Sequence, residues 1–95
     1  MFNTKQLKKD LQKVAKDIRA AGGYYETPKA MMTERQIKNN TATLNCDHWK
    51  VEEIKARVID TPAFSSLVQK YNLTFFMFTD NYGRNHIRLN YSLEA

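Results

Sequence analysis

The chain has 95 residues, 42% apolar and 26% charged, which is the composition of one globular domain and excludes an intrinsically disordered chain. A single cysteine excludes an internal disulfide, and no apolar run approaches the roughly 18 residues of a membrane-spanning helix. The opening Met-Phe-Asn-Thr-Lys lacks the apolar region of a signal peptide. We therefore expect one domain over residues 1–95, in the cytoplasm and without membrane contact.

The net charge of +5 lies in the N-terminal part of the sequence. Residues 1–38 hold nine Lys and Arg against four acids, an excess of five, whereas residues 39–95 hold six of each. Such asymmetry favours an acidic partner for the N-terminal part.

A first helix is expected between Asn3 and the Gly22-Gly23 pair. Asn3 is a favourable N-cap, Gln6 completes a capping-box pattern, and Phe2 and Leu7 have the spacing of a hydrophobic staple. Glycine at the end suits a left-handed C-cap. One helical face collects the apolar residues Leu7, Leu11, Val14, Ala15 and Ile18.

The region 24–46 carries weaker signals. Tyr24-Tyr25 fits either a short strand or an aromatic lid. A short helix is expected within 28–39, starting at Thr27-Pro28 or at Thr33. The alternating, threonine-rich segment 41–46 predicts a strand with inward Ala42, Leu44 and Cys46.

Two further helices are expected next. Asp47 could cap a helix over 48–59 whose apolar positions are Val51, Ile54 and Val58. Thr61-Pro62 starts another, which Asn72 closes, with Phe64, Leu67, Val68 and Tyr71 on one face.

A hairpin is expected at the C-terminal end. The β-prone run 73–79 is followed by turn residues 80–85 and by an alternating strand that places Ile87, Leu89, Tyr91 and Leu93 on one face. The fold class predicted is α+β, in the order α-(α)-β-α-α-β-β. It consists of a small antiparallel sheet with a C-terminal β-hairpin and helices packed on one face.

The first helix carries the leading candidate binding surface. Opposite its apolar face lie Lys5, Lys9, Lys16 and Arg19, flanked by Lys8 and Lys13, while Asp10 and Asp17 lie together on one flank. Like charges at i,i+4 weaken a helix by a few tenths of a kcal/mol per pair. A partner that supplies phosphates or carboxylates would offset that cost. The alternative is a solvated face that serves solubility alone.

The hairpin offers the second candidate surface. Phe76 and Phe78 share a face with His86 and Arg88, and Arg84 lies in the turn. Aromatics beside arginines can stack single-stranded bases or anchor a protein interface. Alternatively, helices bury both faces of this strand.

The sequence favours neither metal binding nor catalysis. Cys46 and His48 are the only soft ligands near each other, fewer than the four of a structural zinc site. Cys46, Asp47 and a histidine lie too close in sequence for a catalytic triad, and the three glycines form no phosphate loop. We expect a protein without enzymatic activity, catalytic residues, metal or cofactor.

The overall format resembles that of the small phage-encoded anti-CRISPR proteins. The features that carry the resemblance are the opening Met-Phe-Asn-Thr-Lys-Gln-Leu-Lys-Lys-Asp-Leu, the single cysteine and the aromatic hairpin 75–84. No shared motif is involved, so the resemblance assigns no residue a role. It implies an inhibitor that docks on a Cas effector complex, on its protein subunits or guide RNA, and blocks nucleic-acid access. A basic chain departs from the acidic DNA mimics of that group, which favours contact with RNA, phosphates or acidic protein surfaces.

Three functions remain open at this point. The first is an inhibitor or adaptor that binds a ribonucleoprotein or protein complex in the host cytoplasm. The second is an independent nucleic-acid-binding regulator, and the third is a structural or assembly protein. The absence of a second recognition element, such as a helix-turn-helix pair, favours the first. The sequence does not indicate an oligomeric state.

Overall fold

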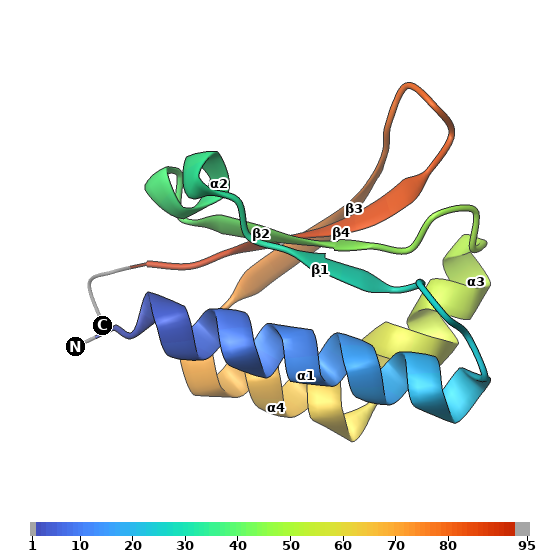
Figure 1. Ribbon diagram of the computed structural model, residues 1–95, viewed down its shortest axis with the longest axis horizontal. Helices are drawn as coiled ribbons and strands as arrows, with labels where there is room; N and C mark the ends of the chain where they lie inside the picture. Colours follow the sequence, from blue (N-terminus) through green and yellow to red (C-terminus); the bar gives the residue numbers. More distant parts are fainter. Residues whose placement is uncertain (1, 93–95) are drawn as a thin grey trace.

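The computed structural model describes residues 2–92, and Figure 1 shows its two-layer architecture. Four antiparallel strands form one sheet in the order β1-β2-β4-β3, built from β1 (Lys29–Met31), β2 (Thr41–Asn45), β4 (Asn85–Asn90) and β3 (Thr74–Thr79). The helices α1 (Thr4–Gly22), α3 (Val51–Ile54) and α4 (Pro62–Tyr71) lie on one side, and short α2 (Glu34–Lys38) lies over the other. The predicted α+β class with a C-terminal hairpin is therefore confirmed, whereas α2 differs from the expectation that the helices pack on one face.

Helix α1 forms as its sequence predicts. The side chain of Asn3 accepts a hydrogen bond from the backbone N–H of Gln6, and Gly23 closes the helix in the left-handed conformation, with φ of 72°. The five apolar residues expected on the inner face are all buried. The Gln6 side chain differs from the capping-box expectation, because it donates to Asp10. The ring of Phe2 stacks on Tyr91 at 4.9 Å.

The sequence missed strand β1. The expected helix start at Thr27-Pro28 is wrong, because the chain runs extended after a buried Pro28 and pairs Ala30 with Leu44 of β2. The other expected start is correct, since Thr33 caps α2 in a full capping box with Gln36.

Strand β2 lies inside the sheet, and its inward Ala42, Leu44 and Cys46 are fully buried as expected. The expected cap at Asp47 is wrong. Its positive φ of 54° belongs to a turn in which its carbonyl accepts from the N–H of Asn85, and α3 starts only after Lys50. Val51 is exposed, whereas Ile54 and Val58 are buried.

A π-helical segment, η1 (Lys55–Ile59), continues α3 before α4 begins at the predicted cap Thr61. Asn72 ends α4 in the left-handed conformation, also as predicted. The predicted burial of Ile87, Leu89 and Tyr91 is confirmed, and Leu93 lies outside the described residues. These residues and the inner faces of α1 and α4 build the core.

Among the described residues, no helix combines the length and the apolar character that a bilayer crossing requires.

Candidate functional site

The solvent face of α1 carries a basic stripe, which we define as Lys5, Lys8, Lys9, Lys13 and Lys16. All five residues are exposed, whereas the apolar residues of α1 are buried. Of these five lysines, only Lys13 pairs with a carboxylate within residues 2–92, that of Asp17 at 3.6 Å. The stripe therefore presents a concentrated positive charge with little internal neutralisation.

Arg19 was expected in the same solvent stripe but makes an intramolecular contact instead. It is only partly exposed, and its Nη1 donates a 2.6 Å hydrogen bond to the carbonyl of Pro28. This bond ties the end of α1 to the segment that leads into β1. Gln12, Lys16, Arg19, Lys29 and Ala30 line a hollow of about 310 Å³ between these elements. Lys29 thus adds a cation beside the stripe, and the helical periodicity of α1 could not have indicated it.

Asp10, expected on the same flank of the helix as Asp17, is a structural hub that several side chains contact. Its carboxylate accepts hydrogen bonds from Lys70 Nζ (2.8 Å), Tyr71 Oη (2.5 Å) and Gln6 Nε2 (2.9 Å). These bonds, that from the Lys70 ammonium most of all, lower the pKa of Asp10 from 3.8 to about 2. Asp10 therefore joins α1 to α4, whereas Asp17 remains a surface residue.

The second candidate surface is the outer face of the sheet. The pairs Phe76–Arg88 and Phe78–His86 stand in register across β3 and β4, as expected. Phe76 is 50% exposed, so burial of both faces of this strand is excluded. Phe78 lies between β4 neighbours, stacked on the His86 ring at 4.8 Å and 4.9 Å from the Arg88 guanidinium carbon. Phe76 is thus the most open ring of this face.

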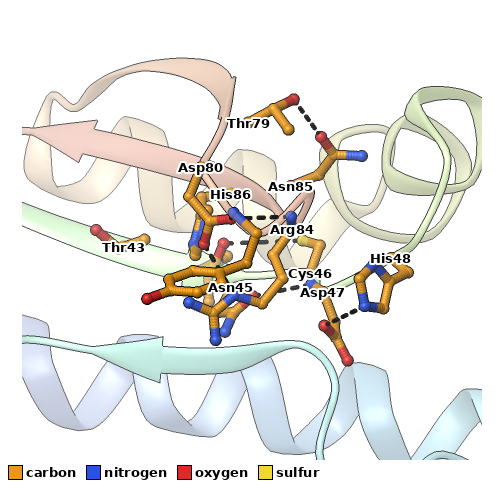
Figure 2. Close-up of polar contacts among 12 residues, drawn as sticks. Thr43, Asn45, Cys46, Asp47, His48, Thr79, Asp80, Arg84, Asn85 and His86 are labelled. Carbon is orange, nitrogen blue, oxygen red and sulfur yellow. Dashed lines mark hydrogen bonds and ion pairs between the residues drawn. The ribbon is translucent and has the colours of Figure 1, made fainter.

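Arg84 is engaged within the hairpin turn. The carboxylate of Asp80 accepts from the N–H groups of Tyr82 (2.9 Å) and Arg84 (3.0 Å) and from Arg84 Nε (2.9 Å). It also lies 2.8 Å from Nε2 of the buried His86 (Figure 2). These contacts, led by His86, hold the pKa of Asp80 well below its usual range. Arg84 is therefore less free to reach a partner than expected. The only sequence signal for these contacts of Asp80 was an Asp at the first position of a turn.

Cys46 is fully buried at the end of β2, and burial raises the pKa of its thiol to about 12. Figure 2 shows it near Asp47 and His48, but the contact of His48 is with Asp47, at 3.6 Å. Within residues 2–92 no three His, Cys, Asp or Glu side chains gather as metal ligands. A buried thiol with a raised pKa is a poor nucleophile.

A third cluster of side chains was not predicted from the sequence. The ring centroids of Trp49 and Tyr24 are 4.9 Å apart. The guanidinium carbon of Arg57, on the π-helical segment, lies 5.2 Å from the centroid of Tyr24 and 5.7 Å from that of Trp49. Tyr24 and Arg57 also help to line a mostly apolar hollow of about 440 Å³ at the end of α1. These residues come from three separate segments, so no local pattern could have grouped them.

Comparison of the chain with protein-family models, with curated proteins and with solved structures finds no match. The function is therefore inferred from the surfaces described above.

Proposed function

We propose that the protein is a non-enzymatic adaptor or inhibitor that binds an acidic partner through the basic stripe of α1. The observation that supports the proposal is the exposure of five lysines on one helix face with a single ion pair among them in the described residues. Lys29 extends this positive charge past Arg19 onto the neighbouring strand. Such a surface suits phosphates or clustered carboxylates.

Within this proposal, the partner is a ribonucleoprotein complex of the cytoplasm, in the manner of anti-CRISPR proteins that dock on a Cas effector and its guide RNA. The resemblance in format supports that class of partner. The charge supports contact with a nucleic-acid backbone over mimicry of DNA, because a mimic presents acids where α1 presents lysines.

The decisive experiment is affinity capture from a bacterial lysate, with and without nuclease, by the wild-type chain and two charge-matched variants. The first variant changes Lys5, Lys9 and Lys16 to Gln. The second changes Lys38, Lys50 and Lys55 to Gln; these lysines are also exposed but belong to α2, the N-cap of α3 and η1. We expect the stripe variant to lose the captured complex and the matched variant to retain it.

Binding of the purified complex then measures the contacts. If the partner offers phosphates, the slope of log affinity against log salt should become shallower by about one for each lysine contact removed. If both triple variants bind the complex with equal affinity at physiological salt, the stripe is only a solvated face and the proposal is refuted. Tight binding of naked RNA or DNA at that salt concentration would instead favour an independent nucleic-acid-binding regulator.

A further inference from the structure

The two edges of the sheet differ in how well they are protected against pairing. At one edge, β1 has only three residues and carries Lys29, and short strands and lysines are devices that keep edges from pairing. At the other edge, β3 has six residues, Thr-Phe-Phe-Met-Phe-Thr, without charge, proline or bulge. Its Phe75 and Phe76 are 38% and 50% exposed. An edge of this kind is a template for another strand.

The hydrogen-bond pattern shows which backbone groups of β3 face outward. The N–H of Asp80 donates to the carbonyl of Arg84, so this pair is of the hydrogen-bonded type. Pair types alternate along an antiparallel ladder, and the register of β3 with β4 is unbroken. Thr74, Phe76 and Phe78 therefore bond to β4. The N–H and C=O groups of Phe75, Met77 and Thr79 point away from it, toward the open edge.

We propose that β3 pairs with β3 of a second copy of this chain, antiparallel about a two-fold axis perpendicular to the sheet. This arrangement keeps the outer faces of both copies on the same side. Phe76 then opposes Phe76 of the second copy on the outer face, as a non-hydrogen-bonded pair, the type in which side chains lie closest. On the inner face, Phe75 opposes Met77. The two sheets become one of eight strands.

Charge and symmetry favour a second copy as the occupant. Strand β3 is uncharged, and in the dimer its apolar side chains would face apolar side chains of the second β3. No like charges therefore meet at the axis, although each copy carries a net charge of +5. The nearest outer-face cations, the two Arg88 residues, would stand about three strand spacings or ~14 Å apart, beyond the Debye length at physiological salt. A single edge buries less than the ~800 Å² per partner of a standard interface, so the dimer is of the weak, concentration-dependent class.

This inference is independent of the proposed function and adds to it. The axis is perpendicular to the sheet, so both copies of α1 lie on the same side of the joined sheet. The dimer would present two basic stripes to one partner surface, which raises avidity without a new contact.

The test is sedimentation equilibrium of the full chain from low micromolar to about millimolar concentration. We expect a monomer–dimer equilibrium that Phe76→Lys and Phe76→Glu each weaken at least about tenfold, because like charges then meet at the axis. An equimolar mixture of the two variants should restore a dimer through the Lys–Glu pair. The control is Met31→Lys, which introduces the same charge on β1, the protected edge strand, and should leave the dimer intact.

Amide hydrogen exchange of the wild-type chain gives a readout without any variant. The N–H groups of Phe75 and Met77 should exchange more slowly as concentration rises, in step with dimer formation. The proposal is overturned by a monomer at millimolar concentration, by a dimer that both Phe76 variants leave intact, or by concentration-independent exchange of these two amides. Failure of the mixture to associate would also overturn it.

Discussion

Replacement of Asp10 by Asn should destabilise the protein in a pH-dependent way. Its pKa of about 2 in the folded chain lies roughly 1.8 units below the ordinary 3.8, and each unit corresponds to 1.36 kcal/mol, so the shift amounts to ~2.4 kcal/mol. Lys70, the main cause, is 59% exposed, and solvent screening reduces the expected loss to about 1–2 kcal/mol. The folded pKa is depressed. The contribution is therefore complete above about pH 4 and is lost as the pH falls through about 2.

Urea unfolding followed by circular dichroism at pH 7, 5, 3 and 2 measures this difference. The gap between the wild type and Asp10→Asn should be about 1–2 kcal/mol at pH 7 and should close toward pH 2. Asp17→Asn is the matched control and should change stability by less than about 0.5 kcal/mol, because Asp17 is exposed and pairs only with Lys13. A gap that stays constant between pH 7 and 2, or that is absent at pH 7, would refute the hub at Asp10.

Three further outcomes follow from the packing. Phe64→Ala should cost about 3–5 kcal/mol in urea unfolding, because the ring is fully buried and meets Phe75 edge-to-face at 5.1 Å. Cys46→Ala should leave partner binding within a few-fold, and the native thiol should resist an aromatic disulfide reagent until the chain unfolds, because burial raises its pKa to about 12. Rapid labelling of the thiol in the native state would contradict the prediction for Cys46. Gly23→Ala should cost about 1–2 kcal/mol in thermal unfolding, because its φ of 72° is left-handed, although an added Cβ would meet no neighbour. An unchanged melting temperature would contradict this prediction.

The sequence predicted the elements whose signals are local. Asn3 and Gly23 bound α1, Thr61 and Asn72 bound α4, and the alternation of Ile87 and Leu89 identified β4 and its buried face. In each case a cap or a period of two is legible within a few residues.

The remainder depends on contacts between distant segments. The segment 29–31 is a strand only because β2 lies beside it, since three residues carry no periodicity of their own. The same limit applies to the candidate site. Periodicity placed the lysines of α1 in solvent, but the bonds of Asp10 to Lys70 and of Arg19 to Pro28 link residues that no helical spacing relates.

The position of β4 in the sheet has a consequence for how the protein is made. This strand pairs with both β2 and β3, yet it is the last of the four to be synthesised. Until residues 85–90 have left the ribosome, β2 and β3 have no shared neighbour, and the inward Ile87 and Leu89 are missing from the core. The 73–79 segment therefore lacks its native partner strand until β4 has left the ribosome, and in that interval a chaperone would have most to protect.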